Sequence, residues 1–258
     1  MSSSSSSSAA AAEVAALDLS REDERADALF YAGPRMVKHL DAGACFVLTE
    51  HLRDALARFA DLRDAASGRE GADVLDLCAS WVSHLPHDVA LARVHGLGLN
   101  EAELAANGQL SDFRVQDLNA DPALRHLAAA AFDAAVCACG VMYLTRPLEV
   151  ARELRRVLRP GGVVVVSFSN RMFPSKATRA WVRGDDEAHM AYAAALLRAA
   201  GFVRVEALDL SPSERGVSDP LFVVQGFKAE EGAESAAAEE EGRSGREGGS
   251  GPVVNAAL

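Results

Sequence analysis

The stretch from Asp73 to Asn170 constrains the fold of this chain most, because it repeats the order strand, turn and helix. It opens on VLDLCASWVSH and closes on FDAAVCACGVMYLTRPLEVARELRRVLRPGGVVVVSFSN. The run Val163–Phe168 is apolar without alternation, which is typical of a strand that helices cover on both faces. Strands that alternate with helices of this length predict a mostly parallel α/β sheet with right-handed crossovers.

We expect seven strands in this sheet, each a short apolar run. They are residues 73–77, 90–99, 113–116, 132–140, 163–168, 202–210 and 221–227. Helices are expected at 46–66, from Asn100 through Asn107, after Thr145 and at 186–200. In the third of these helices, Thr145 is the expected N-cap and Pro147 lies in the first turn.

A chain of 258 residues with 49% hydrophobic content is expected to form about one domain. Residues 1–24 form a Ser/Ala-rich tail and residues 229–258 an acidic tail, and neither has enough apolar surface to offset the entropy of ordering. We therefore expect disordered termini around a domain at residues 25–228. Within it, 25–70 is predicted as a helical prelude and 71–228 as the sheet core.

The formal net charge of −11 argues against a nucleic-acid partner. Seven Glu and two Arg follow position 228, so the charge of the tail is −5 and the rest of the chain carries −6. No apolar run reaches the ~18–20 residues that span a bilayer. Four cysteines favour a reduced, intracellular and cytoplasmic setting over a disulfide framework. A plastid or other organelle is the alternative, because the start is Ser-rich and poor in acidic residues, although its first Arg is Arg21.

Phe132-Asp133, the turn Leu158–Gly162 with the strand after it, and LLRAAGF at Leu196–Phe202 occur here in a specific order and spacing. In this arrangement, the region from Asp73 to Lys228 resembles the class I S-adenosylmethionine-dependent methyltransferases of the methyltransferase-11 type. VLDLCASWVSHLP and DPLFVVQGFK also resemble a plant and algal subgroup of that superfamily. The resemblance implies a single Rossmann-like sheet, S-adenosylmethionine as cofactor, and a small-molecule acceptor.

The loop after the first strand departs from the family pattern Asp-x-Gly-x-Gly-x-Gly. Asp76 matches the acidic position, but Cys78, Ser80 and Val82 stand at the three glycine positions. Glycine there lets the backbone approach the cofactor, and a Cβ narrows the pocket or moves the loop outward. Cys78 and Ser80 are small, so a shifted cradle that still binds is one expectation and a dead site is the other. Trp81 is expected either to cover the adenosine or to fill its space.

Two further cofactor contacts follow from the resemblance. Gly98 stands where the family usually carries a carboxylate for the ribose, so Asn100 or Glu101 is a candidate to reach the sugar instead. The alternative is that Asn100 only caps the following helix. Asp117, followed by Leu118, matches the acidic residue beside the adenine amino group. An Asp at the end of a strand is also a common turn former.

Methyl transfer needs alignment and exclusion of water more than it needs reactive side chains. His84, Tyr143 and His189 are candidates for a catalytic role such as proton removal, with His84 and Tyr143 preferred. His84 and His87 form a His-x-x-His pair around Pro86, but no third ligand accompanies them, so no metal is predicted.

Several other side chains are expected near the acceptor or in the core. Asn170 and Arg171 follow the fifth strand, and Phe30, Tyr31 and Arg35 could form a lid. Cys137 and Cys139 share one face of the fourth strand if it runs to Gly140, and the expectation is that both act as small core hydrophobes.

The leading hypothesis is thus methyl transfer to an unidentified small molecule by in-line displacement. A protein of this fold that binds or regulates without turnover is the runner-up, and a cofactor-dependent protein with different chemistry is the third. The first two differ in whether the crevice above Asp76 is open or is filled by Trp81. Oligomeric state and acceptor are not fixed by the sequence.

Overall fold

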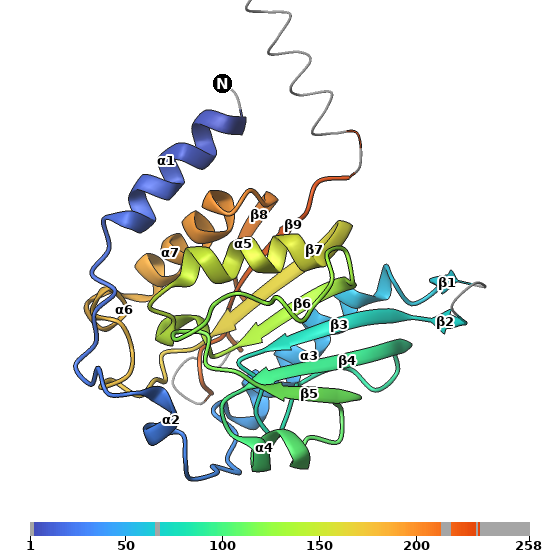
Figure 1. Ribbon diagram of the computed structural model, residues 1–258, viewed down its shortest axis with the longest axis horizontal. Helices are drawn as coiled ribbons and strands as arrows, with labels where there is room; N and C mark the ends of the chain where they lie inside the picture. The colour runs from blue at the N-terminus through green and yellow to red at the C-terminus, as the bar shows by residue number, and fades with distance from the viewer. Residues whose placement is uncertain (1–2, 65–67, 213–217, 231, 233–258) are drawn as a thin grey trace, which may run out of the picture.

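A seven-stranded sheet forms the centre of the molecule (Figure 1), and it is seen in a computed structural model that describes residues 3–64, 68–212, 218–230 and 232. The strand order is β5-β4-β3-β6-β7-β9-β8. The strands are β3 (Ala72–Leu77), β4 (Leu91–Gly98), β5 (Asp112–Val115), β6 (Phe132–Ala138), β7 (Leu158–Phe168), β8 (Val203–Asp209) and β9 (Phe222–Phe227).

The sheet confirms the predicted fold class. Strands β3 to β7 pair in parallel, while β9 lies antiparallel between β7 and β8. From β3 the chain proceeds outward to β4 and β5, then returns to the other side of β3 to form β6. The strand order therefore reverses between β3 and β6, and ligands of such sheets bind beyond the carboxyl ends of the strands at this switch point.

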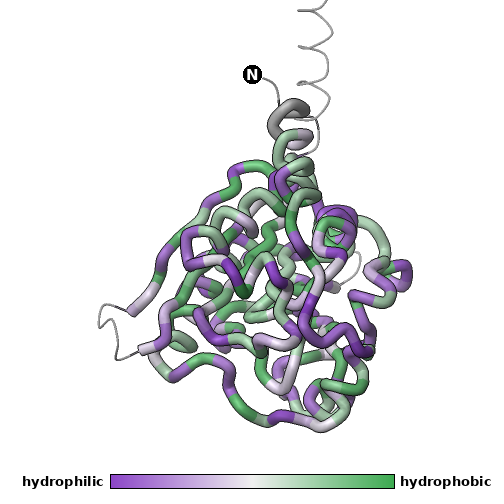
Figure 2. Tube along the Cα trace, turned by 90° about the vertical axis from the view of Figure 1, so that its left-hand side faces the viewer, coloured by the Kyte–Doolittle hydropathy of each residue, from purple (hydrophilic) through white to green (hydrophobic). Residues whose placement is uncertain are grey.

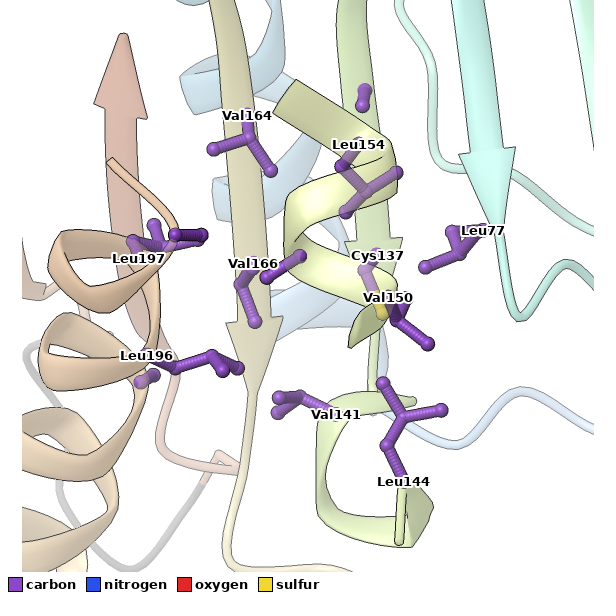
Figure 3. Close-up of a cluster of buried hydrophobic side chains, with 14 of the residues drawn as sticks. Leu77, Cys137, Val141, Leu144, Val150, Leu154, Val164, Val166, Leu196 and Leu197 are labelled. Carbon is purple, nitrogen blue, oxygen red and sulfur yellow. The ribbon is translucent and has the colours of Figure 1, made fainter. Parts of the chain in front are cut away.

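Helices cover both faces of the sheet, as the non-alternating strands predict. The helices are α1 (Ser3–Ala15), α2 (Asp27–Phe30), α3 (Ala42–Ala57), α4 (Glu101–Ala106), α5 (Pro147–Val157), α6 (Arg179–Arg183) and α7 (Asp186–Ala199), with a 3₁₀ turn η1 (Val141–Tyr143). On β7, Val164 and Val166 face α5 and α7 (Figure 3), whereas Val163 and Val165 belong to the cluster under α3.

Helix α5 confirms the predicted element, but not its cap. Pro147 occupies the first turn and the helix buries Val150 and Leu154 against the sheet. The N-cap position is Arg146, and no side chain caps it. Thr145 instead donates its backbone N–H to the Asn119 Oδ1 at 2.8 Å, so its place is set by a loop 26 residues earlier.

Helix α3 ends earlier than its sequence pattern predicts. Leu52 and Leu56 are buried as expected, but the helix stops at Ala57 and the expected continuation to residue 66 is wrong. The chain forms a short antiparallel pair there, β1 (Arg63–Asp64) and β2 (Arg69–Glu70). The apolar pattern continues past the helix because Phe59 still packs on the core from the turn.

The expectation of a disordered start at residues 1–24 is wrong for the part that the structure describes. Helix α1 packs along α7, and its Ala10 and Val14 are buried in the main core cluster. Apolar surface alone does not explain this helix, and two other properties of alanine contribute. It is the best helix former, and its small side chain lets two helices approach closely. Most of the acidic tail at 229–258 lies outside the described residues.

Between α1 and α3 the chain runs as a strap, residues 16–41, across the carboxyl ends of the strands (Figure 1). Backbone hydrogen bonds fix it to the segment before and within α6: the N–H of Asp23 donates to the Ser175 carbonyl, and the N–H of Arg179 donates to the Ser20 carbonyl, each at 2.8 Å. Hydrophobic stretches of chain cross the middle of the molecule and hydrophilic ones lie mainly around it (Figure 2). No helix in the described part of the chain is long and apolar enough to cross a membrane.

Candidate cofactor and active site

A cavity of about 750 Å³ opens at the carboxyl ends of the parallel strands. Its walls come from the loops after β3, β4, β5 and β6, from residues 170–174 after β7, and from the strap. The volume lies in the upper part of the ~300–1,000 Å³ range of ligand sites. Nine of the ten site residues predicted from the sequence line it: Asp76, Cys78, Ser80, His84, Gly98, Asn100, Asp117, Leu118 and Tyr143.

Trp81 is the exception, and the expectation that it covers or fills the adenosine site is wrong. It does not line the cavity, and its indole Nε1–H donates to the Val37 carbonyl of the strap at 3.0 Å. The strap backbone thus supplies the acceptor for the indole N–H, although the side chain is only partly buried. The crevice above Asp76 is therefore open.

The glycine-poor loop after β3 has room for its side chains because glycines face it from the neighbouring segments of the chain. Cys78 holds the left-handed conformation, with φ of 57°, that glycine adopts without strain. A Cβ on Gly140 would lie 2.5 Å from the Cβ of Cys78, and one on Gly98 would overlap the carbonyl oxygen of Ala79. The side chains of the loop therefore occupy space that is available because positions 140 and 98 are glycine. A carboxylate side chain at position 98 would collide with the loop, which explains why none stands there.

Three non-glycine residues along the cavity have positive φ: Cys78, His84 at 55° and Cys139 at 53°. Each such residue costs roughly 1–2 kcal/mol. Backbone strain of this kind is retained at binding and catalytic sites, where the surroundings hold it in place. The loops around the cavity therefore carry the local strain typical of a functional site.

Asp76 is the buried carboxylate of the site. Its side chain is 3% exposed, and its Oδ2 has no hydrogen-bond partner among the described residues. Burial raises the pKa of Asp76 to about 7, while the Ser83 hydroxyl lowers it in part. A carboxylate oxygen without a partner at the wall of a cavity is a position for a donor from a ligand, since such groups are costly to leave unsatisfied.

Asn100 is used by the protein itself. Its Oδ1 accepts from the Glu103 N–H and caps α4, as the capping interpretation predicts. Its Nδ2 donates to the carbonyls of Tyr31 at 2.8 Å and Ala32 at 3.3 Å in the strap. Both ends of the amide are engaged, which favours capping over contact with a sugar. Glu101 does not line the cavity.

Glu103 lines the cavity, and sequence reasoning missed it. One oxygen accepts from the Arg35 backbone N–H at 2.6 Å and the other from the Ser80 hydroxyl at 2.5 Å. It is 9% exposed although it lies in the first turn of a short helix. The sequence places Glu103 at position N3 of a capping box. An acidic residue at N3 is usually exposed to solvent, so this position did not indicate a site residue.

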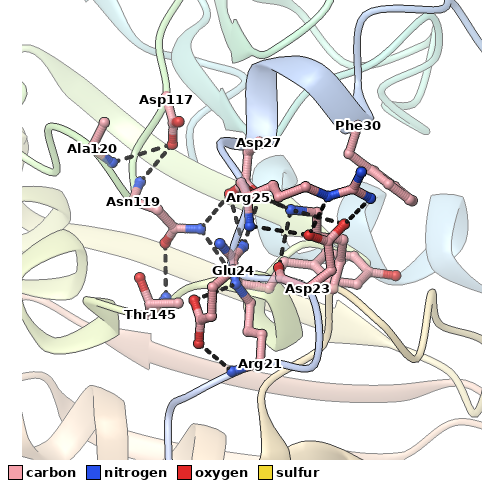
Figure 4. A network of polar contacts seen from close by, with 12 residues as sticks. Arg21, Asp23, Glu24, Arg25, Asp27, Phe30, Asp117, Asn119, Ala120 and Thr145 are labelled. Carbon is pink, nitrogen blue, oxygen red and sulfur yellow. Dashed lines mark hydrogen bonds and ion pairs between the residues drawn. The ribbon is translucent and has the colours of Figure 1, made fainter.

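Asp117 forms the turn that its sequence position allowed, and it also lies at the cavity. Its Oδ1 accepts from the backbone N–H groups of Asn119 at 2.9 Å and Ala120 at 3.2 Å, which forms a turn (Figure 4). The residue also lines the cavity beside Leu118. The turn fixes the orientation of the carboxylate and uses only one of its oxygens in the described contacts.

The three catalytic candidates are placed differently. His84 lines the cavity, and burial lowers its pKa to about 4, helped by the charges of Lys38 and His39. The Tyr143 hydroxyl accepts from the Phe173 N–H at 2.9 Å, and burial raises its pKa. His189 is not in the site.

His189 stacks on Trp181 with 4.0 Å between ring centroids, and its Nε2 lies 2.8 Å from the Trp181 carbonyl. It is a core residue of α7.

The two cysteines that were expected on one face of a strand lie in different places. Strand β6 ends at Ala138, so Cys137 joins the core under α5 while Cys139 lines the cavity. Burial raises the pKa of Cys139 to about 12, so it is a protonated thiol at neutral pH.

No group of three or more His, Cys, Asp or Glu side chains able to hold a metal ion occurs in the part of the chain that the structure describes.

A buried ionic cluster fastens the strap over the site (Figure 4). Asp27, 3% exposed, pairs with the Arg21 guanidinium at 2.8 Å and the Lys176 ammonium at 3.0 Å. Its Oδ2 also accepts from the Asn119 amide at 2.8 Å, and that amide reaches the Tyr143 carbonyl. Although burial opposes it, these donors lower the pKa of Asp27, so the carboxylate is charged. We define Arg21, Asp27, Asn119 and Lys176 as the clasp.

Gly98→Ala is expected to destabilise the protein by about 1–3 kcal/mol, the usual cost of overpacking. The new Cβ would overlap the Ala79 carbonyl oxygen, which is backbone and cannot rotate away. Gly108→Ala is the matched control, because no atom lies within 4 Å of the position its Cβ would take. Urea unfolding of both variants measures the difference, and equal stability would mean that the loop yields without cost.

Comparison with known proteins finds one matching family model and solved structures of similar fold. Residues 77–166 match the family model described as a methyltransferase domain. An S-adenosylmethionine-dependent methyltransferase from Mesorhizobium loti is 16% identical, with 70% of this chain and 98% of that chain covered and a TM-score of 0.48. The [4+2]-cyclase SpnF is 18% identical, with coverages of 77% and 89% and a TM-score of 0.51.

Phosphoethanolamine N-methyltransferase 2 from Haemonchus contortus, in a complex with S-adenosyl-L-methionine, is 12% identical, with coverages of 70% and 53% and a TM-score of 0.47. No curated protein matches the sequence. At these identities the solved structures show likeness of fold alone. The matched segment runs from the end of β3 into β7 and so includes the glycine-poor loop. The match and the sheet order together support the class I methyltransferase superfamily.

Proposed function

We propose that this protein transfers the methyl group of S-adenosylmethionine to a small-molecule acceptor by in-line displacement. The observation that carries the proposal is the open cavity at the switch point of the sheet, with the unpartnered oxygen of Asp76 at its wall. The methyltransferase-domain match over residues 77–166 supports S-adenosylmethionine as the cofactor. We further propose, from its opening and closing sequences, that the chain belongs with a plant and algal subgroup that carries this first loop.

The residues fit the cofactor at several points. The Asp76 oxygen without a partner suits the ammonium group of the cofactor, and Cys78 keeps the left-handed turn of a glycine loop. Asp117 and Leu118 suit the adenine. The Asn100 amide is engaged at both ends, so we assign the ribose to Glu103. Each of its two carboxylate oxygens accepts one hydrogen bond in the protein and keeps a further lone pair for a ribose hydroxyl.

The cofactor supplies an activated methyl group together with its leaving group, so the chain has to align the acceptor and exclude water. The strap closes one side of the cavity, with Tyr31 and Arg35 in its wall. His84 is neutral at pH 7 because its pKa is lowered, so its imidazole is free to accept a proton from an oxygen or nitrogen acceptor. The Tyr143 hydroxyl accepts from Phe173, which leaves its own proton to donate to the acceptor and fix its orientation.

The alternative is a protein of this fold that binds without turnover. Its expected signature, Trp81 in the crevice, is absent from the cavity wall. The test is a calorimetric titration of the full chain with S-adenosylmethionine and S-adenosylhomocysteine. Micromolar binding of both, followed by appearance of S-adenosylhomocysteine when acceptors are added, supports methyl transfer. Binding without turnover over a broad acceptor panel favours the alternative, and no heat or thermal shift at millimolar ligand contradicts the proposal.

Asp117→Asn is expected to weaken S-adenosylmethionine binding by about tenfold, the ~1.4 kcal/mol of one hydrogen bond to a charged group. Asparagine keeps the Oδ1 that accepts from Asn119 and Ala120, so the turn survives and only the second oxygen is lost. Asp121→Asn, an exposed carboxylate in the same loop, is the control. Calorimetry compares the two, and unchanged affinity in Asp117→Asn would place the adenine elsewhere.

A further inference from the structure

The strap carries basic side chains into the cavity from one short segment. Arg35, Lys38 and His39 all line it. No carboxylate lies within ion-pair distance of the Arg35 or Lys38 side chain in the described part of the chain. The Glu103 carboxylate is close to Arg35, but it accepts from the backbone N–H of that residue rather than from its guanidinium.

The Arg35 guanidinium is held among aromatic rings. Its Cζ lies 4.6 Å from the ring centre of Phe30, 5.7 Å from Tyr31 and 5.4 Å from Phe173. One terminal nitrogen donates to the Phe30 carbonyl at 2.9 Å, and the other, Nη1, is buried with no hydrogen-bond partner among the described residues. The rings fix the guanidinium and displace water from it, so its charge and its free donors remain to be met by a ligand.

The position of this group separates it from the cofactor residues. Asp76 and Gly98 lie at the ends of β3 and β4, and Asp117 follows β5, on one side of the switch point. Tyr143 and Phe173 follow β6 and β7, on the other side, and Arg35 reaches Phe173 across the cavity. Asp76 and Asp117 thus come from the side where a cationic cofactor is proposed, whereas the Phe173 ring beside the Arg35 guanidinium comes from the other side.

The walls of the cavity are mostly apolar. They include Val37 and Leu40 of the strap, and Met172 and Phe173 after β7. Val37 is 56% exposed, and neighbouring Met36 is 46% exposed, so apolar surface continues out of the cavity along the strap. An apolar wall beside the unpaired cations Arg35 and Lys38 is suited to a ligand with an apolar body and an anionic end.

We propose that the acceptor is a small molecule with an apolar body and an anionic oxygen group, which Arg35 binds with the help of Lys38. This inference rests on the proposed function and names the substrate class of the same site. His84 lines the same cavity as Arg35 and Lys38, so an acceptor anchored on the strap shares the cavity with the proposed base.

Benzoate, phenyl phosphate and the neutral benzamide are the probes, titrated by calorimetry into the full chain with and without saturating S-adenosylhomocysteine. We expect at least one of the two anions to bind and benzamide to bind about tenfold more weakly or not at all. Arg35→Met, which keeps an apolar chain among the rings, should weaken the anion by about tenfold to a hundredfold, and Arg35→Lys should restore part of the loss.

Arg125→Ala is the matched control, because this guanidinium is 79% exposed, is paired with Asp121 at 3.3 Å and does not line the cavity, so anion binding should stay nearly unchanged. If Arg35→Met fails to fold, which circular dichroism detects, Lys38→Met takes its place with a smaller expected loss. Equal binding of benzoate, phenyl phosphate and benzamide, or equal anion affinity in Arg35→Met and wild type, overturns the proposal. Failure of S-adenosylhomocysteine to bind overturns the proposed function instead, and the titrations without it still test the anion site.

Discussion

Asp76→Asn is expected to weaken S-adenosylmethionine binding by about a hundredfold and, in the same variant, to stabilise the unliganded protein above pH 7. The loss follows because a buried carboxylate that meets a cation contributes up to about 3 kcal/mol, which is roughly a hundredfold in affinity. The gain follows because the unliganded fold bears the cost of an ionised, buried Asp76 whose Oδ2 has no partner in the described residues. A substitution that lowers ligand affinity but raises the stability of the unliganded protein distinguishes a ligand-binding carboxylate from a structural one.

The pH dependence of this effect follows from the raised pKa. Asp76 titrates near 7 in the folded protein and near 3.8 when unfolded. The folded state therefore binds more protons between these values, so the contribution of Asp76 to stability is complete below about pH 4 and is lost as the pH rises through about 7. Wild type and Asp76→Asn should be similarly stable near pH 4, and the variant should be more stable at pH 8.

The affinity for S-adenosylmethionine should also depend on the protonation of Asp76. A cationic ligand needs the ionised carboxylate, so wild-type affinity should rise up to about pH 7 and then level off. At pH 6 binding should release close to one proton, which calorimetry in buffers of different ionisation enthalpy measures, and Asp76→Asn should release almost none. An affinity of the variant within twofold of wild type would show that no cation meets Asp76.

Most of the sheet was predictable because the local sequence pattern of its strands indicates them. Val163–Phe168 is apolar except at Ser167 and does not alternate, which is typical of a strand buried on both faces. The structure buries it from α3 on one side and from α5 and α7 on the other. The helix after Pro147 likewise carries its proline, its apolar stripe and its terminal arginines within 11 residues. Such elements are encoded by their own residues.

The site residues were predictable by position along strands, but their partners were not. Asp76 and Asp117 lie at strand ends, where the topology gathers ligand contacts. Trp81 was misplaced because its direction depends on the Val37 carbonyl, 44 residues earlier. The glycine at position 98 is explained by the Ala79 carbonyl, which packs against it and leaves no room for a Cβ. Contacts between distant segments leave no local pattern.

Lys176 is the clearest case of a residue whose role the sequence hides. It stands in Phe-Pro-Ser-Lys, which is typical of an exposed loop, yet its side chain is 0% exposed. Its ammonium pairs with Asp27 and donates to the carbonyls of Asp23 at 3.1 Å and Arg25 at 2.6 Å. One loop after β7 thus holds the strap at three points.

Lys176→Met is therefore expected to lower stability by about 3 kcal/mol, the lower end for removing one partner from a buried ion pair. In a domain of this size that corresponds to a fall in melting temperature of about 6–12 °C. The strap carbonyls would lose their donor, while Arg21 still neutralises Asp27, so the strap should loosen without global unfolding. Hydrogen exchange across residues 16–41 should rise more than across the sheet.

The clasp also predicts a consequence for binding, because Asp27, Tyr31 and Arg35 belong both to the strap and to the cavity wall. Loosening it should weaken an acceptor more than the cofactor, whose proposed contacts lie mainly after β3, β4 and β5. Arg183→Ala is the matched control: its exposed pair with Asp18 at 3.3 Å also joins the strap to α6, and such pairs contribute about 0–1 kcal/mol. If Lys176→Met melts and exchanges like Arg183→Ala, the strap is held by its backbone bonds and the clasp adds little. If it melts several degrees lower with exchange raised only in the strap, burial of these charges is what closes the site.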